Sequence, residues 1–195
     1  IDFSHPSVLE DLLAFAKEKK IPAVIATTGL NEQQIGDIRT ASNDIPLFFS
    51  ANMSIGVSLV SELAKKAAKV LQGSFDIEIV EAHHNQKADS PSGTALEIAK
   101  RVMEGYPEKT EMVFDAFHER PAKNQLHVSS TRCGNIPGTH KVFFDGIADT
   151  IELTHTARSR EGFATGAVQT LVKLDNALKT GKLSKGNLYF IEDVI

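Results

Sequence analysis

The side chains best suited to chemistry gather in the stretch 81–95 of the sequence. Two adjacent histidines, His83 and His84, are followed there by Lys87. An imidazole titrates near neutral pH and can act as a general acid or base, and a lysine ammonium can supply a proton or meet a carboxylate. This combination predicts a proton-transfer group beside a site that holds a small dianion.

The elements on both sides of this stretch must place those side chains. The run 75–80 is strand-like, so the side chains of His83 and His84, where the strand ends, should diverge by about half a turn. One imidazole can then face a pocket while the other orients it or meets the ligand from the side. Lys87 follows in a polar loop, from which its flexible side chain can reach the same ligand.

A helix is predicted to begin at the end of the stretch. Thr94 with Glu97 fits a capping box, in which the two side chains satisfy backbone N–H groups of the first turn. Gly93 permits a close approach of the backbone, and the start of a helix favours a bound anion. We therefore expect a carboxylate to be held near Gly93 and Thr94.

The two histidines could instead be structural, as single histidines more often are, or they could bind a metal ion. No His-Glu-x-x-His pattern and no cysteine cluster accompanies His83 and His84, although these are the usual companions of zinc-binding histidines. The sequence therefore predicts no metal site, and a metal-dependent hydrolase is a weaker alternative than proton transfer.

The composition narrows the class of protein. The chain has 195 residues, a formal net charge of −4 and one cysteine, Cys133. A mildly acidic chain is a poor general binder of nucleic acid or of an anionic membrane, and no apolar run approaches the length of a membrane span. One cysteine cannot form an intramolecular disulfide. We expect a cytoplasmic protein with no nucleic-acid or membrane partner.

Residues 1–53 alternate between apolar strand-like runs and amphipathic helical runs, which predicts part of a doubly wound α/β domain with a parallel sheet. The strand-like runs are 1–3, 23–26 and 46–49, and the helical runs are 6–20 and 31–38. Ligands of such sheets bind outside the carboxyl ends of the strands. The loops 26–29 and 50–53 occupy those ends, but they are equally consistent with ordinary connections.

Residues 54–180 are expected to form a second domain. Four strand-like runs together with 75–80 predict an open mixed or antiparallel sheet, with helices on one face. The strand-like runs are 111–117, 126–131, 139–144 and 150–156, and the helical runs are 54–71, 95–104 and 162–178. Residues 181–195 are expected to return to the first domain.

The stretch 81–95 resembles the signature of the dihydrodipicolinate reductases, now called 4-hydroxy-tetrahydrodipicolinate reductases. The matching residues are Glu81-Ala82-His83-His84-x-x-Lys87-x-Asp89-x-Pro91-Ser92-Gly93-Thr94-Ala95. Further agreements run along nearly the whole chain. The resemblance implies a Rossmann-type domain followed by a domain for substrate binding and oligomerisation. It also implies reduction of a small cyclic dicarboxylate by NADH or NADPH on the diaminopimelate route to lysine.

The resemblance also assigns roles to residues of the stretch. It implies that His83 is the general acid/base and that Lys87 is a second proton donor. His84, Gly93 and Thr94 would bind the substrate. Asp89 is expected to orient Lys87 or its loop rather than to react.

The nicotinamide cofactor would be held by residues that match the family's cofactor loops. These are Phe3, Ser4, Ala26, Thr27, Thr28, Ser50, Ala51, Asn52 and Met53, with Arg160 near the cofactor. Ala26 stands where the family usually has glycine, and Met53 where it has phenylalanine. The family's Gly-x-Gly-x-x-Gly is missing from this sequence, and with it the residues that choose between NADH and NADPH. We expect this motif in an additional upstream segment of about 60 to 80 residues, because one βαβ unit takes roughly 30 residues or more.

Other questions stay open at this stage. Arg132 matches a family Arg-x-Gly, and it could be an exposed turn residue or a substrate contact. The resemblance implies a homotetramer built through the second-domain sheet. The alternatives to this reductase are a related reductase of another small dicarboxylate and a non-catalytic dicarboxylate sensor.

Overall fold

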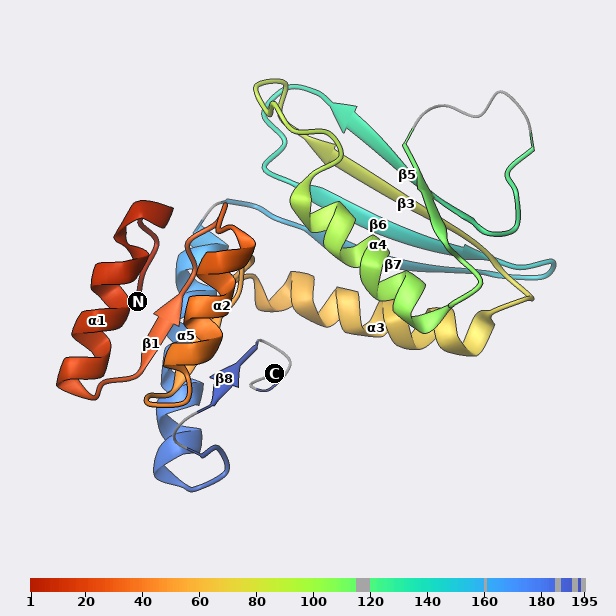
Figure 1. Ribbon diagram of the computed structural model, residues 1–195. Coiled ribbons are helices and arrows are strands. Elements are labelled where there is room, and N and C mark those ends of the chain that lie inside the picture. Colours follow the sequence, from red (N-terminus) through yellow and green to blue (C-terminus); the bar gives the residue numbers. More distant parts are fainter. Residues whose placement is uncertain (115–119, 160, 185–186, 191–192, 194–195) are drawn as a thin grey trace. The chain divides into compact units, whose positions relative to one another are not determined.

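The chain folds into two compact units, which Figure 1 shows with their elements labelled. The computed structural model describes residues 1–114, 120–159, 161–184, 187–190 and 193. The first unit combines Ile1–Ile55 with Glu161–Ile195, and the second is Gly56–Arg160. Within the described ranges, no helix is both long enough and apolar enough to cross a membrane.

The first unit is built on a parallel three-stranded sheet. Its strands are β1 (Ala23–Ile25), β2 (Leu47–Phe49) and β8 (Leu188–Tyr189), in the order β1-β2-β8. Asp2 adds a parallel bridge to Ile25 at the free edge of β1. The sheet is therefore the Rossmann-type parallel sheet that the sequence predicts.

Helices cover both faces of this sheet because the strands are apolar on both sides. Ala23 and Ile25 face the helices α1 (Leu9–Lys19) and α2 (Glu32–Ala41), which follow the short 3₁₀ helix η1 (Pro6–Val8). Val24 and Phe48 face the other way. They pack with Ala167 and Leu174 of α5 (Glu161–Lys179).

The position of α5 corrects one expectation. We predicted the helical run 162–178 as part of the second domain, but α5 packs in the first unit. At Gly166 the helix approaches the main chain so closely that a Cβ atom would lie 1.8 Å from the carbonyl oxygen of Met53. The amphipathic pattern shows which face of a helix is apolar, but it does not show which sheet that face covers.

The second unit contains a mixed five-stranded sheet in the order β4-β5-β3-β6-β7. Its elements are α3 (Ile55–Leu71), β3 (Asp76–His83), α4 (Gly93–Gly105), β4 (Glu111–Val113), β5 (Gln125–Arg132), β6 (Thr139–Asp145) and β7 (Thr150–Thr156). β3 pairs in parallel with β5 and antiparallel with β6, so it is the central strand. The predicted strand 111–117 ends at Val113, and 115–119 lie outside the described residues.

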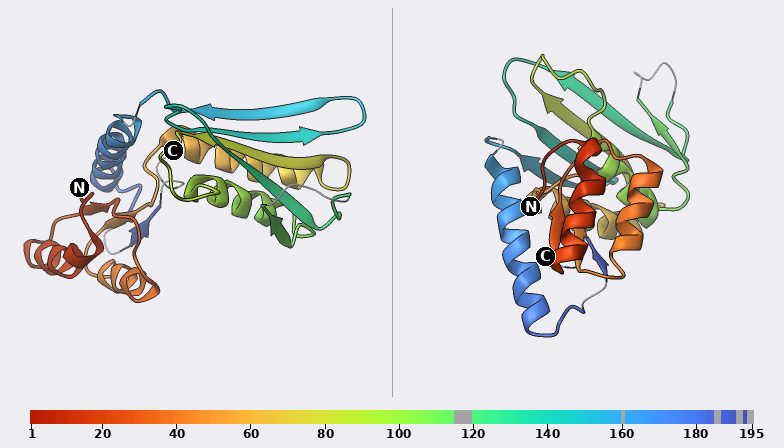
Figure 2. Two further views of the ribbon diagram at one scale, coloured as in Figure 1. Left: turned by 90° about the horizontal axis from the view of Figure 1, so that it is seen from above. Right: turned by 60° about the vertical axis from the view of Figure 1, so that its left-hand side comes forward.

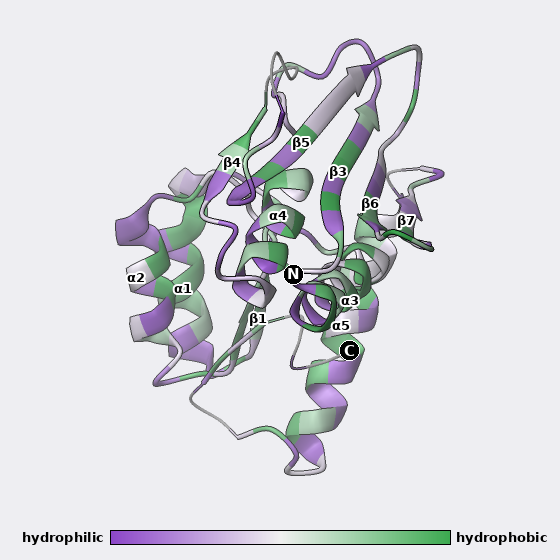
Figure 3. Cartoon of the chain, turned by 90° about the vertical axis from the view of Figure 1, so that its right-hand side faces the viewer, coloured by the Kyte–Doolittle hydropathy of each residue, from purple (hydrophilic) through white to green (hydrophobic). Residues whose placement is uncertain are grey.

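Both α3 and α4 cover the same face of this sheet, as Figure 2 shows. Burial alternates along β3, where Ile77, Ile79 and Glu81 point to the helices. Hydrophilic and hydrophobic residues alternate in the first part of this strand (Figure 3), but the buried Glu81 is hydrophilic. Ala64 of α3 and Ile98 of α4 join Ile79 in one core. The fold therefore confirms an open mixed sheet with helices on one face.

Candidate active site

The candidate site lies where the ends of several elements of the second unit meet. β3 and β5 run in parallel, and their register pairs His83 with Arg132. β6 begins beside the end of β3, with His140 paired to Glu81. The loop after β3 leads to the first turn of α4. Residues far apart in the sequence are therefore brought to one end of the sheet.

His83 occupies the last position of β3 and is nearly buried, with 8% of its surface exposed. Its Nδ1 atom lies 2.5 Å from Oε2 of Glu81. The two residues are separated by one position on a strand, so their side chains lie on the same face of the sheet. The ring is thus held by a carboxylate on its own strand.

Glu81 is 0% exposed, yet its carboxyl group is ionised at neutral pH because its pKa is lowered. Arg132 donates to both of its oxygens, from Nη1 to Oε2 at 2.9 Å and from Nη2 to Oε1 at 2.8 Å. The backbone N–H of Ser92 donates to Oε1 at 3.0 Å. Burial alone would raise the pKa of Glu81, but the hydrogen bonds from Arg132 and His83 outweigh it and lower the pKa from 4.5 to about 2.

The sequence analysis gave Glu81 no role. Its side chain was recognised only as part of the motif, although the spacing Glu-x-His at a strand end already places both groups on one face. Arg132 is neither an exposed turn residue nor free to bind a ligand through its terminal nitrogens. Its Nη1 and Nη2 atoms are engaged by Glu81, by the Thr131 carbonyl and by the Asp89 carbonyl.

Lys87 lies in the loop after β3, and its side chain is 22% exposed. Its Nζ atom is 2.8 Å from Oδ1 of Asp89. The hydrogen bond from Lys87 lowers the pKa of Asp89. Arg132 holds the main chain of the same residue, because Nη2 donates to the Asp89 carbonyl at 2.6 Å. Asp89 is therefore placed where it could orient Lys87 or its loop, as expected from the sequence.

The start of α4 differs from the predicted capping box. Ser92, not Thr94, is the N-cap: its side chain accepts the Ala95 N–H at 3.2 Å. Gly93 and Thr94 are consequently the first two helical residues, at the end of the helix whose dipole favours an anion. The backbone of Gly93 hydrogen-bonds to the Asp89 carboxylate. Gly93 is exposed, and Thr94 and His84 are half-buried. A cis peptide bond joins Ser90 to Pro91 just before the cap.

His140, which matches the family's Gly-x-His together with Gly138, is a further histidine of the site, and the sequence predicts no role for it. It is 4% exposed, and its Nε2 atom lies 3.1 Å from Oγ of Ser92. Its ring meets the ring of His83 edge-on, with centroids 5.1 Å apart. Burial, with the nearby His83 as a second cause, lowers the pKa of His140 to about 4. His140 is therefore neutral at physiological pH.

Gly138 leaves room at the other nitrogen of His83. A Cβ atom at position 138 would lie 3.0 Å from Nε2 of His83. The φ angle of Gly138 is +155°, within the range that favours glycine. Nε2 is thus approached on this side by a residue without a side chain.

The residues assigned to the cofactor lie in the first unit, apart from Arg160, which lies outside the described residues. Phe3, Ser4, Thr28 and Ala51 are exposed, and Ser50 is half-buried. Ala26, Thr27, Asn52 and Met53 are buried. The Thr27 hydroxyl donates to Oδ2 of Asp2 at 2.5 Å, and the Asn52 side-chain oxygen accepts the Ser54 N–H at 2.9 Å. Both buried side chains therefore stabilise the conformation of their loops.

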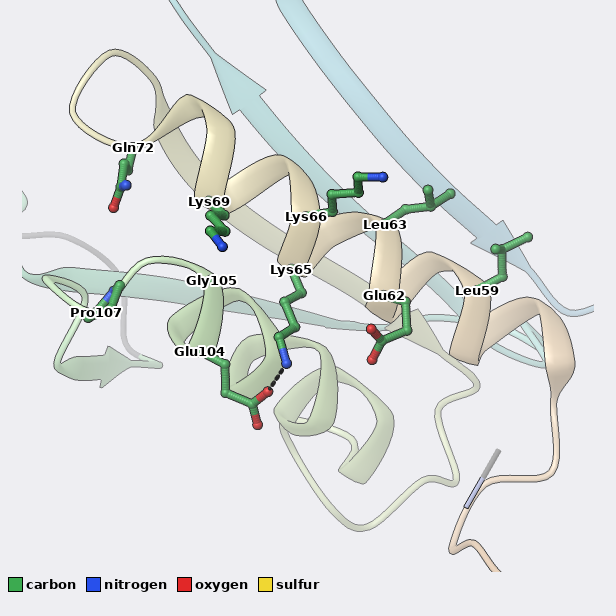
Figure 4. Close-up of a pocket in the computed structure, with 10 residues that line it drawn as sticks. All are labelled: Leu59, Glu62, Leu63, Lys65, Lys66, Lys69, Gln72, Glu104, Gly105 and Pro107. Carbon is green, nitrogen blue, oxygen red and sulfur yellow. Dashed lines mark hydrogen bonds and ion pairs between the residues drawn. The ribbon is translucent and has the colours of Figure 1, made fainter. Parts of the chain in front are cut away.

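A groove on the second unit lies apart from these groups. It is formed by α3 and the end of α4, where Lys65 pairs with Glu104 across the gap at 2.7 Å (Figure 4). None of the described substrate-site residues lines it. Among the described residues, no group of three or more histidine, cysteine, aspartate or glutamate side chains is placed to hold a metal ion.

Comparisons with known proteins agree along the whole chain. The family model "Dihydrodipicolinate reductase, N-terminus" matches residues 1–53, and "Dihydrodipicolinate reductase, C-terminus" matches residues 56–195. The 4-hydroxy-tetrahydrodipicolinate reductase of Clostridium tetani is 46% identical over 170 residues, which is 87% of this chain and 67% of the relative. That of Caldanaerobacter subterraneus is 44% identical over 197 residues, covering 100% of this chain and 75% of the relative.

A solved structure has the same fold. The chain aligns with a dipicolinate-bound dihydrodipicolinate reductase from Paenisporosarcina sp. TG-14 with a TM-score of 0.78 and 22% identity, covering 100% of this chain and 72% of the other. The family models and the curated relatives together show that this chain belongs to the dihydrodipicolinate reductase family.

Proposed function

We propose that the protein reduces 4-hydroxy-tetrahydrodipicolinate to tetrahydrodipicolinate with NADH or NADPH, in diaminopimelate and lysine biosynthesis. Family membership supports the reaction, and the name of its curated relatives supports the substrate. The observation that carries the proposal is the buried Glu81–His83 pair, which lies in one site with Lys87 and the start of α4.

The exposed residues of the first unit fit a nicotinamide cofactor. Phe3 is 53% exposed at the end of the first strand-like segment, next to β1, and can offer an apolar surface to a ring. Ser4 and Thr28 offer exposed hydroxyls at the carboxyl edge of a parallel sheet, where such ligands bind. Thr27, Asn52 and Met53 would contribute to cofactor binding through their backbone atoms and by fixing the conformation of the loops. When bound, the cofactor supplies the hydride.

The proton is the part of the reaction that this chain's own residues control. Reduction adds a proton to the carbon next to the one that receives hydride. Because ionised Glu81 can only accept hydrogen bonds, Nδ1 of His83 carries a proton, and Nε2 is left to exchange one with the substrate. Lys87 is the second proton donor and the positive partner of the substrate.

The substrate's carboxylates would be bound around the start of α4. The positive end of the α4 dipole and the Thr94 hydroxyl would attract a carboxylate there, and Gly93 would allow it to approach the main chain closely. His84 belongs to the loop that leads to this helix. Charge-assisted hydrogen bonds of this kind are stronger than neutral ones. Ser92 ties this turn to Glu81 through its N–H, which supports placing the carboxylate near His83.

We further propose a cytoplasmic homotetramer assembled through the sheet of the second unit. α3 and α4 cover one face of that sheet, while the other face carries Glu78 and Phe143 with no helix of this unit over it in the described ranges. Sedimentation equilibrium would test the assembly, and a monomer at micromolar concentration would contradict it.

The test of the reaction is the loss of NADH or NADPH absorbance by the full-length protein, supplied with freshly made product of dihydrodipicolinate synthase. We expect oxidation that depends on this product, and a decrease in kcat of about two to four orders of magnitude in His83→Gln, the usual range for general acid–base catalysis. The exposed His5 gives the matched control, because His5→Gln should leave kcat unchanged.

Two results would contradict the proposal. Near wild-type kcat in His83→Gln would reject the acid/base role. No oxidation with either cofactor by a folded protein would favour a dicarboxylate sensor instead.

A further inference from the structure

We infer that Arg132 is a positioning residue that organises both proton-transfer groups, His83 through Glu81 and Lys87 through the main chain at Asp89. The inference rests on the roles proposed above for His83 and Lys87. Arg132 acts through other residues: its Nη1 and Nη2 atoms donate to Glu81, Thr131 and Asp89.

The first connection fixes the ring of His83. Arg132 holds both oxygens of Glu81 at 2.8 and 2.9 Å, so the carboxylate cannot rotate without losing a hydrogen bond. Oε2 is then presented to Nδ1 of His83 at 2.5 Å. An ionised carboxylate accepts only, so this contact selects the tautomer with its proton on Nδ1. The position of Arg132 therefore determines which nitrogen of His83 is basic.

The second connection fixes the loop that carries Lys87. Nη2 of Arg132 donates to the Asp89 carbonyl at 2.6 Å, and the side chain of Asp89 holds Nζ of Lys87 at 2.8 Å. The Lys87 N–H also donates to the His84 carbonyl at 3.2 Å. One guanidinium thus joins the end of β3 to the loop after it, and the distance between the two proton-transfer groups depends on that joint.

The chemistry of this joint requires arginine. Nη1 and Nη2 make four hydrogen bonds, to two carboxylate oxygens and two carbonyl oxygens. A planar guanidinium can serve all four, whereas a lysine ammonium is a point charge with three donors and cannot chelate a carboxylate in the same way. Arg132→Lys therefore keeps the positive charge but removes the planar set of N–H donors that binds Glu81, Thr131 and Asp89.

The opening at Gly138 agrees with this assignment. The carboxylate occupies Nδ1 of His83, while the missing side chain at position 138 leaves space beside Nε2. Selection of the Nδ1–H tautomer is useful only if Nε2 can be reached. The two features together direct proton exchange to one nitrogen.

The experiment compares Arg132→Lys with Arg101→Lys in the full-length protein. Arg101 is the matched control because it also pairs with carboxylates, Glu62 at 3.5 Å and Glu104 at 3.3 Å, but on the helices rather than in the site. Two readouts are taken: steady-state kinetics, and ¹⁵N NMR of histidine-labelled protein above pH 8. The signals of His83 are identified by their loss in His83→Gln.

For Arg132→Lys we expect kcat to fall by about 10- to 100-fold, the cost of misplacing a catalytic group by around 1 Å, with KM nearly unchanged. In the wild type, neutral His83 should show a protonated Nδ1 and an unprotonated Nε2. The variant should show a mixture of the two tautomers. Arg101→Lys should change neither readout.

The outcomes separate this inference from the proposed reaction. A wild-type tautomer and wild-type kcat in Arg132→Lys would overturn it, and so would a lower kcat with an unchanged tautomer, since that result indicates a general structural role. If the protein reduced no dicarboxylate, the tautomer would still decide whether Arg132 positions His83. If Arg132→Lys failed to fold, the double variant Glu81→Gln with Arg132→Met, which removes both charges, should fold and lose the tautomer preference; retention of the preference would reject the inference.

Discussion

At the residue scale, the site depends on a carboxylate that has no contact with water. Isolation of a charge in a protein interior costs several kcal/mol unless partners surround it. Glu81 has such partners in Arg132, His83 and Ser92, and its pKa falls from 4.5 to about 2. Because the folded state holds this proton less tightly than the unfolded state does, Glu81 stabilises the fold fully above about pH 4.5 and loses that contribution as the pH falls toward 2.

His140 gives the residue-scale prediction, because burial lowers its pKa from 6.5 to about 4. The unfolded state therefore binds the proton first, and stability is lost as the pH falls from 6.5 toward 4. The shift corresponds to roughly 3 kcal/mol, at most about 1.4 kcal/mol for each pH unit. Denaturant unfolding at several pH values should show this slope, and His140→Gln should flatten it.

Several charged groups affect the pKa of His140, and the controls must account for them. Glu81 raises the pKa of His140, while His83, His155 and Lys87 lower it. The pKa of His155 is itself lowered by burial, so a smaller slope should remain in His140→Gln. His5→Gln should keep the wild-type slope. An unchanged slope in His140→Gln would show that His140 does not titrate differently on folding.

At the scale of elements, the sequence predicted most helices and strands of the second unit but not how their ends meet. The run 75–80 is predicted to be a strand, whereas the pairing of β3 with β5, which brings Arg132 to His83, depends on residues about fifty positions apart. The capping-box pattern fits Thr94 with Glu97 but not Ser92, whose third residue on is Ala95, so the local pattern indicated the wrong cap for α4. The motif therefore predicts which groups transfer protons, and only the fold shows which residues hold them.

The contact between α3 and α4 gives the element-scale prediction. A Cβ atom at Gly105 would lie 2.2 Å from the backbone carbonyl oxygen of Lys65, and a backbone atom cannot move away as a flexible side chain can. Gly105→Ala should therefore lower the free energy of unfolding by about 1–3 kcal/mol, the usual cost of overpacking. Denaturant titration measures it.

Gly36 of α2 supplies the control for that substitution. Nothing lies within 4 Å of a Cβ atom built there, so Gly36→Ala should be neutral or stabilising by up to about 1 kcal/mol, as expected from helix propensity. Equal effects of the two substitutions would mean that α3 and α4 do not approach each other as closely as the structure places them.

At the scale of the whole molecule, the two units differ in how the chain builds them. Among the residues that the structure describes, those in the core of the second unit lie between Ala64 and Leu153. The first unit is discontinuous, because Val24 and Phe48 are covered by residues of α5 and β8 from the other end of the chain. The run 162–178 looked like a continuation of the second domain because sequence order was the only guide to its neighbours.

This difference leads to the last prediction, which concerns the segments separately. Residues 56–160 contain a complete core and should unfold in one cooperative transition when expressed alone, as small single domains usually do. Residues 1–55 alone should not, because the apolar face of β1 and β2 that α5 covers would be exposed to water. Thermal unfolding followed by near-UV circular dichroism, which reports fixed packing of aromatic side chains, would distinguish the two. A disordered 56–160 segment would show that its core needs the first unit, and a folded 1–55 segment would show that α5 contributes less to its stability than the packing of Ala167 and Leu174 indicates.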